Sequence, residues 1–128
     1  MLSTDITINP GTTGGANVNN VYNLIGWKTP NSTLRRVAGT AGVAPDELTV
    51  SHQETVRSGV TVNRHMIRID KTYNDSLKGA QKVSAWVVVE VPMGVTAITS
   101  TEYNEVLGRV HAALALSGLK TALYNGES

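Results

Sequence analysis

The sequence predicts an α+β fold in which an antiparallel β-sheet carries an N-terminal β-hairpin and a C-terminal helix. The segment Lys82–Pro92, KVSAWVVVEVP, alternates with a period of two, which is typical of a strand with one apolar face. Beyond Pro92 the apolar period changes to about 3.6, which indicates a helix. Upstream, alternating segments are separated by glycine and proline. We therefore expect antiparallel strands first and the helix last.

Length and composition indicate one domain without cofactor chemistry. The 128 residues suffice for a single core, which we divide into an N-terminal hairpin (1–27), main sheet strands (33–92) and C-terminal helices (99–124). Eleven lysines and arginines face ten acidic residues, so only the placement of charges can argue for nucleic acid. Cysteine is absent, which excludes disulfides and thiolate metal sites. No signal or transmembrane segment is recognisable, and we expect no membrane association.

The N-terminal third is expected to form a hairpin and one further strand. Thr4–Ile8 alternates, the glycine-rich stretch Pro10–Gly15 follows, and Asn20–Trp27 is the expected return strand. The stretch lacks the Gly-Lys-Ser/Thr ending of a phosphate-binding loop, so a hairpin connection is favoured. Thr33–Val37 is a candidate third strand, and the small residues of Ala38–Pro45 indicate a loop.

Two longer strands follow, Glu47–Thr55 and Thr61–Thr72, with a turn at Gly59. Val60 and Val62 are out of phase with the rest of the second strand, which suggests a bulge near Asn63. With a period of two, one face of these strands is formed by Leu48, Val50, His52, His65, Ile67 and Ile69. The opposite face is polar and includes Thr49, Ser51, Gln53, Arg64, Met66, Arg68 and Asp70.

The last third contains a flexible polar loop, a strand and the helix. The loop, 73–81, joins the second long strand to Lys82–Pro92. Thr99 and Glu102 fit a capping box, with Thr99 as N-cap. Ser117 and Gly118 are expected to end the helix, and 119–124 to add a further turn or two. The helical stripe consists of Tyr103, Val106, Leu107, Val110, Ala113 and Leu114.

A monomer of this composition leaves apolar surface uncovered. One helix of about fifteen residues is only about 22 Å long, whereas five strands span about 24 Å. The last strand would also be a long exposed edge. A two-fold dimer that pairs these edges and lays each helix on the partner's sheet removes both problems.

Four segments have local sequence patterns that can be compared with known families. Thr49-Val50-Ser51 forms a Thr-x-Ser strand, Arg64–Asp70 a basic alternating strand, and Ala85–Pro92 a strand ending in a hydrophobic-proline pair. The helix start at Thr99–Glu102 is rich in serine and threonine. In this order, after a glycine-turn hairpin, they resemble the coat proteins of single-stranded RNA bacteriophages, the leviviruses, over most of the chain.

The resemblance implies a capsid protein. Its dimers are expected to have one continuous sheet covered by interlocked helices. They are expected to assemble into an icosahedral shell, with T=3 expected, which forms the virion. The protein is expected to be made in the cytoplasm of the bacterial host. The inner sheet face is expected to bind genomic RNA and an RNA hairpin that represses replicase translation, and a maturation protein is a further expected partner. Loop 73–81 corresponds to the loop that gathers around symmetry axes, although the proline of some family members is absent here.

The expected RNA-binding residues are those of the polar face. Arginine and lysine neutralise phosphates, hydroxyls and amides bond base edges, and an aromatic ring stacks on an unpaired base. Asp70 and Glu90 lie on the same face and would repel phosphate unless they lie at its rim, and Val88 interrupts it with an apolar residue. The set is Thr49, Ser51, Gln53, Arg64, Met66, Arg68, Lys82, Ser84 and Trp86.

Other interpretations remain open. Without the family context, a solvated sheet face is the favoured interpretation of Arg64 and Arg68, and only the resemblance favours RNA contact. Trp86 packs against either a base or a neighbouring side chain. His52 and His65 are expected to be satisfied core or interface histidines, and the three histidines have no metal-ligand spacing. No catalytic motif is present. The alternatives are a non-viral dimeric sheet-and-helix module that binds RNA or another ligand, and a small enzyme.

Overall fold

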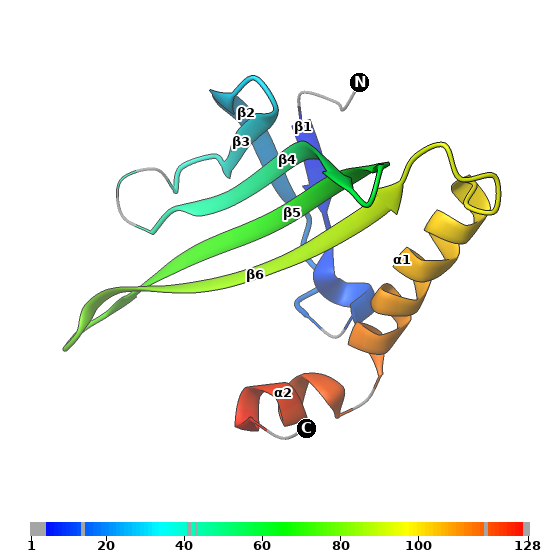
Figure 1. The fold of residues 1–128 in the computed structure, drawn as a ribbon. Helices are drawn as coiled ribbons and strands as arrows, with labels where there is room; N and C mark the ends of the chain where they lie inside the picture. Colours follow the sequence, from blue (N-terminus) through cyan, green and yellow to red (C-terminus); the bar gives the residue numbers. More distant parts are fainter. Residues whose placement is uncertain (1–4, 14, 41, 43, 117, 127–128) are drawn as a thin grey trace.

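The computed structural model describes residues 5–13, 15–40, 42, 44–116 and 118–126. Six strands form one antiparallel sheet in which every strand pairs with its neighbours in chain order, and two helices follow (Figure 1). Thr4 and Ser117, which we expected at the ends of the first strand and the helix, lie outside the described residues. The elements are β1 (Asp5–Ile8), the 3-10 turn η1 (Pro10–Thr13), β2 (Asn20–Thr29), β3 (Ser32–Val37), β4 (Asp46–Arg57), β5 (Val60–Asp75), β6 (Gly79–Pro92), α1 (Ser100–Ala115) and α2 (Leu119–Asn125).

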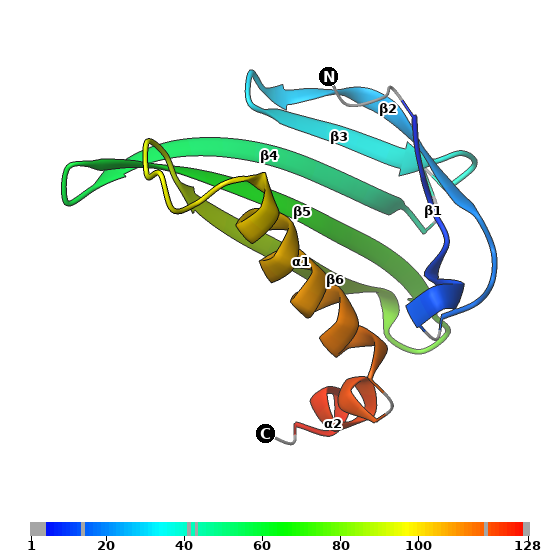
Figure 2. The same cartoon turned by 90° about the vertical axis from the view of Figure 1, so that its right-hand side faces the viewer.

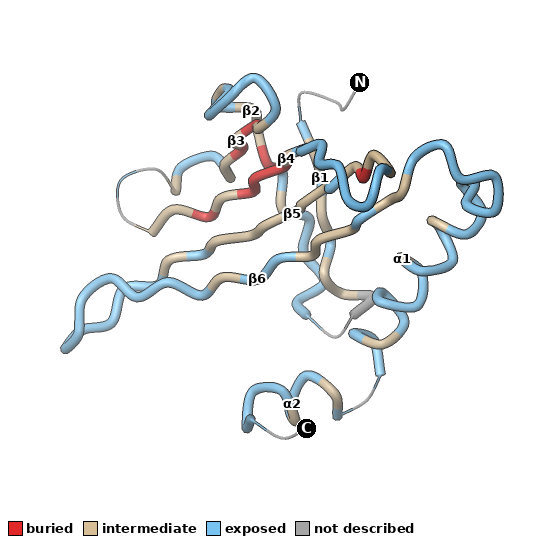
Figure 3. Tube along the Cα trace, in the orientation of Figure 1, coloured by how far each residue is buried: buried red, intermediate tan, exposed pale blue. Residues whose placement is uncertain are grey.

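The sheet is strongly curled, so that β1 stands at a steep angle to the long strands β4–β6 whereas β3 runs alongside β4 (Figures 1 and 2). Buried residues concentrate in β2, β3 and β4 (Figure 3). The core forms around Tyr22, Leu48 and Val50, against which Ile6, Ile8, Val37 and Ile69 pack. The predicted fold class, with its N-terminal hairpin and C-terminal helix, is confirmed.

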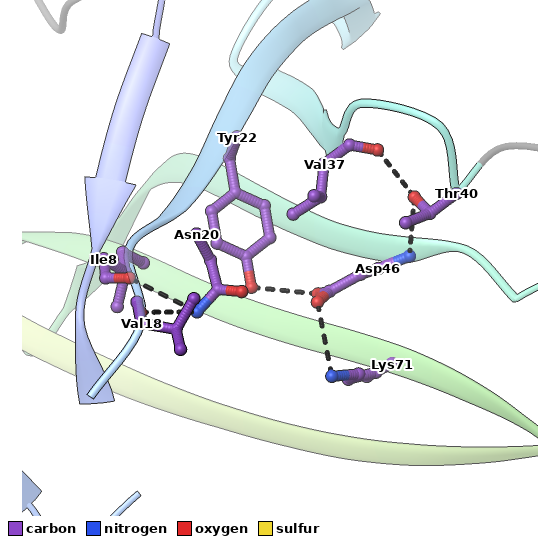
Figure 4. A network of polar contacts seen from close by, with 8 residues as sticks. All are labelled: Ile8, Val18, Asn20, Tyr22, Val37, Thr40, Asp46 and Lys71. Carbon is purple, nitrogen blue, oxygen red and sulfur yellow. Dashed lines mark hydrogen bonds and ion pairs between the residues drawn. The ribbon is translucent and has the colours of Figure 1, made fainter. Parts of the chain in front are cut away.

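A polar network fastens the curled part to the long strands (Figure 4). The Tyr22 hydroxyl donates to Asp46 Oδ1 over 2.9 Å. Lys71 Nζ lies 3.9 Å from Asp46 Oδ2, and the Asp46 N–H donates to Thr40 Oγ1 over 3.3 Å. Burial, then the hydrogen bond to Asp46 and the charge of Asp46, raise the pKa of Tyr22 well above its usual range. The network therefore joins β2, β4, β5 and the loop after β3.

Tight turns set the register of the long strands. Ser58 and Gly59, both with positive φ (51° and 78°), connect β4 to β5 as a two-residue hairpin, the arrangement typical of a type I′ turn. Between β5 and β6, the Asp75 carboxylate accepts from the N–H groups of Leu77 (2.9 Å) and Lys78 (2.7 Å). Because strand pairing continues to Asp75 and resumes at Gly79, most of segment 73–81 is paired strand in this structure.

Two details differ from the expectation. The bulge expected near Asn63 is absent, since β5 pairs with β4 and β6 without a register shift. Val62 therefore shares a face with Arg64, and it is buried there. The irregularities occur instead in β2, between Leu24 and Gly26 and between Trp27 and Thr29. Bulges increase local twist, and these lie in the part of the sheet that curls.

Helix α1 begins as the sequence predicted and then projects from the sheet. The Thr99 N–H donates to Glu102 Oε2 over 2.7 Å, and the Thr101 N–H donates to Thr99 Oγ1 over 3.2 Å, within a capping box. The helix leaves the end of β6, contacts η1, and buries none of its residues (Figure 2). Its stripe is thus only partly covered within one chain: Val106, Val110 and Leu114 are exposed, with Val106 57% exposed.

Candidate nucleic-acid interface

Strand register places every predicted RNA-binding residue on one face of β4–β6, which we call the polar face. Directly paired residues in an antiparallel sheet share a face. Three successive rows across the strands are Thr49–Arg68–Trp86, Ser51–Met66–Val88 and Gln53–Arg64–Glu90. Ser84 pairs with Asp70, and Lys82 pairs with Thr72 nearer the hairpin tip. The polar face includes Glu47, Thr49, Ser51, Gln53, Thr55, Arg57, Val62, Arg64, Met66, Arg68, Asp70, Thr72, Lys82, Ser84, Trp86, Val88 and Glu90.

The first row contains an exposed aromatic platform. Trp86 is 60% exposed, and the Arg68 guanidinium carbon lies 5.6 Å from its ring centroid. At this distance the cation interacts with the π-face. Thr49, by contrast, is buried, so it is less available to a ligand than the other two residues of its row.

Asp70 fixes the arginine of this row. Arg68 Nη2 donates to Asp70 Oδ1 over 2.9 Å, and Arg68 Nε lies 2.8 Å from Asp70 Oδ2. The Ser84 hydroxyl also donates to Asp70 Oδ1. Partial burial acts to raise the pKa of Asp70, but the hydrogen bonds from Arg68 and Ser84 and the charges of Arg68 and Lys82 outweigh it, and the pKa lies below its usual value.

A second carboxylate on this face, that of Glu90, forms ion pairs with two arginines. Arg57 donates to both Glu90 oxygens, Nη1 to Oε2 over 2.7 Å and Nη2 to Oε1 over 3.0 Å. Arg64 Nε lies 3.8 Å from Glu90 Oε1. The two acidic residues of the predicted face are therefore ion-paired with its arginines.

The sequence interpretation omitted Arg57 from this face. The expected strand ended at Thr55, whereas β4 continues to Arg57. The available signal was the alternation itself, because Gln53, Thr55 and Arg57 have the same parity. Arg36 and Glu47, an ion pair across β3 and β4, extend the face toward the N-terminal strands.

The opposite face holds a pair of histidines. His52 and His65 are register partners, and their Nδ1 atoms lie 2.7 Å apart, so one ring donates and the other accepts. As expected, the two rings satisfy each other, although His52 is exposed within one chain. Among the described residues, no group of three or more His, Asp or Glu is arranged to hold a metal ion.

Much of this opposite face is apolar and open. Ile67 and Val83 are 53% and 64% exposed, and Val89 and Val91 line a pocket together with Ile98, Tyr103 and Val106 from the α1 region. Within the described part of the chain, no helix is both long and apolar enough to cross a membrane.

These elements define the fold of the protein chains in virus-like particles of bacteriophages and levi-like viruses. The chain is similar to that of the virus-like particle of bacteriophage ESE020, with 15% sequence identity over 100% of this chain and 99% of that chain and a TM-score of 0.70. The virus-like particle of Wenzhou levi-like virus 4 gives 15% identity over 98% and 88% of the two chains, with a TM-score of 0.70.

A third similar chain, from the virus-like particle of Beihai levi-like virus 32, is 20% identical over 82% of this chain and 85% of that chain, with a TM-score of 0.65. No protein-family model matches the sequence, and no curated protein matches it either. The likeness expected from the sequence is therefore confirmed at the level of the fold.

Proposed function

We propose that this protein is the coat protein of a single-stranded RNA phage and assembles into an icosahedral shell. The observation that carries the proposal is the match in fold over 100% of this chain and 99% of a chain from a virus-like particle. The similarity therefore extends over all the described strands and helices and is not confined to one motif.

The surfaces of the single chain support a dimer as the building block. The apolar stripe of α1 and the apolar side of β5 and β6 are both open, and β6 is an edge strand along its full length. A second copy that pairs its β6 with this edge and lays its α1 on this sheet covers all three surfaces. The hairpin tip within 73–81, with Leu77 93% exposed, then reaches away from the dimer centre toward neighbouring dimers.

The polar face supports RNA binding on the inner side of the shell. It combines arginines, hydroxyl groups and an exposed tryptophan with a cation at its ring, which are the groups that contact phosphates, base edges and unpaired bases. We extend the proposal to genomic RNA and to a hairpin whose binding represses replicase translation. A maturation protein is a further proposed partner of the shell.

Electron microscopy of the protein expressed alone in bacteria tests the proposal, together with the absorbance ratio of any particles at 260 and 280 nm. We expect uniform shells rich in nucleic acid. Empty shells would retain the capsid function and contradict RNA packaging. Small soluble species alone would contradict the capsid and favour the alternative, a non-viral dimeric sheet-and-helix module that binds RNA or another ligand.

A further inference from the structure

Asp70 occupies an unusual place for a carboxylate on a face proposed to bind RNA. It lies inside the face, flanked by Arg68 two residues along β5 and by Ser84 across to β6. Its side chain is only 13% exposed, and it accepts from both neighbours. Because both donors belong to the proposed RNA-binding set, this one acceptor controls how two of its members are presented.

The geometry determines what Arg68 has left to offer. Arg68 Nη2 donates to Asp70 Oδ1 over 2.9 Å, and Nε, the other nitrogen of this guanidinium edge, is buried 2.8 Å from Asp70 Oδ2 without a hydrogen bond. Such an edge is what arginine uses to bind a phosphate bidentately. Because Nη2 is bonded, Nε is buried and the charge is paired, this edge is closed to phosphate, and the group that remains is the guanidinium plane, whose carbon lies 5.6 Å from the Trp86 ring centroid.

We infer that Asp70 is a positioning and specificity-determining residue: by binding the edge of Arg68, it makes the Arg68–Trp86 pair a platform for an unpaired base rather than a clamp for phosphate. This inference rests on the proposed RNA binding. Its consequence is a preference for single-stranded over duplex RNA. Phosphate contacts alone favour the duplex, which carries more charge per length, whereas stacking requires a base outside a helix.

Replacing Asp70 by asparagine tests the inference, with the full chain under conditions where light scattering shows no shells. The probes are a single-stranded oligoadenylate and an A·U RNA duplex of equal length. Wild-type protein is expected to bind the single strand about tenfold tighter. Asp70→Asn removes the charge that pairs with Arg68 and leaves only a neutral amide oxygen as a weaker acceptor, so phosphate can compete for Arg68 and the ratio should fall to about twofold or less. Its log–log salt slope on the duplex should steepen by about 0.9.

Three further variants separate positioning from other roles. Trp86→Leu should lose the single-strand preference without changing the salt slope, because no charge changes. Glu90→Gln releases Arg57 and Arg64 but leaves the platform intact, so it should tighten binding to both probes and preserve their ratio. Asp70→Thr is a second neutral variant, with a residue that is favoured in strands. Circular dichroism shows whether Asp70→Asn and Asp70→Thr are folded, and the binding ratio is measured on a folded variant.

The binding results separate the role of Asp70 from the proposed RNA binding. The inference is overturned if the folded Asp70 variant keeps the wild-type ratio and slope, or weakens both probes in parallel. It is also overturned if wild-type protein prefers the duplex, although the proposed RNA binding then stands. Wild-type protein that binds neither probe at low salt contradicts the RNA function itself.

Discussion

At the scale of single residues, the ion pairs on the polar face determine which charges would be available to the proposed RNA ligand. Arg68 is paired with Asp70, and both Arg57 and Arg64 contact Glu90. Phosphate therefore competes with a carboxylate for each of these three arginines. The face is accordingly suited to contacts that use shape and stacking as well as charge.

Arg68→Ala should weaken RNA binding and flatten its salt dependence. The substitution removes one cation and the group above Trp86, so we expect about a tenfold loss of affinity for single-stranded RNA. The log–log salt slope should fall by at most about 0.7, since Asp70 already pairs the charge. Binding titrations at several salt concentrations measure both. Arg109→Ala, which removes an exposed arginine of α1, is the control, and an equal effect there would contradict the role of Arg68.

The ion-paired carboxylate of Asp70 should also make the free energy of unfolding depend on pH in the acidic range. Its pKa is lower in the folded chain than its ordinary value. A carboxyl group with a depressed pKa stabilises the fold above its unfolded pKa, about 4 for aspartate, and this stabilisation is lost as pH falls through the folded value. Urea unfolding below about pH 5 should therefore show a smaller pH dependence in Asp70→Asn than in wild type. Identical curves for the two proteins would contradict the prediction.

Tyr22→Phe should destabilise the core. Tyr22 and Asp46 are both buried, and the variant removes a 2.9 Å hydrogen bond to a carboxylate. Hydrogen bonds to charged groups contribute about 1.5–3 kcal/mol, so we expect a loss of about 2 kcal/mol in the free energy of unfolding. Urea denaturation measures it. Tyr124→Phe, at a residue that is 91% exposed, should change stability little, and equal effects of the two substitutions would contradict the role of the network.

At the scale of elements, the helix and the long strands follow from local sequence. The capping box at Thr99 and Glu102 starts α1 where the sequence predicted. The period of two in β4, β5 and β6 places residues on the predicted faces because the hairpin turns keep the register continuous.

Thr99→Ala should loosen the first turn of α1. It removes the hydroxyl that accepts from the Thr101 N–H, and loss of such a cap costs about 1 kcal/mol. Hydrogen exchange of the α1 amides should be faster by roughly fivefold. Thr101→Ala, two residues further along the helix, is the control. Unchanged exchange in Thr99→Ala would show that packing alone holds the helix.

The features that the sequence did not predict depend on contacts between different strands. The register shifts of β2, at Leu24–Gly26 and Trp27–Thr29, were not predicted, because alternation gives the face of a residue but not its partner in the next strand. The pairing of Asp70 and Glu90 with arginines was missed because sequence parity gives the face of a residue but not its partner. Arg57 was missed because the expected strand ended two residues too soon.

At the scale of the whole molecule, the single chain is an incomplete layer structure. Its core lies under the curled N-terminal strands, whereas the apolar side of β5 and β6 and the stripe of α1 remain open. In the proposed dimer the same surfaces meet, so assembly and folding share one set of apolar contacts.

Val89→Asp should therefore prevent the dimer and, with it, the shell. Val89 lies on the apolar side of β6, where it pairs with His65 and lines the pocket beside α1. A carboxylate there would be buried without a partner when the second copy binds, which costs several kcal/mol, or a thousandfold or more in the dissociation constant. Sedimentation and electron microscopy measure the result.

The matched control for this variant is its neighbour. Val88 pairs with Met66 on the polar face, so Val88→Asp adds the same charge to the opposite side of the same strand. We expect it to form dimers and shells, because period-two geometry keeps its carboxylate outside the interface. It should also reduce packaged RNA by placing a negative charge among the proposed phosphate contacts. Normal particles from Val89→Asp, or lost dimers from Val88→Asp alone, would mean that the two faces of the sheet have been assigned the wrong way round.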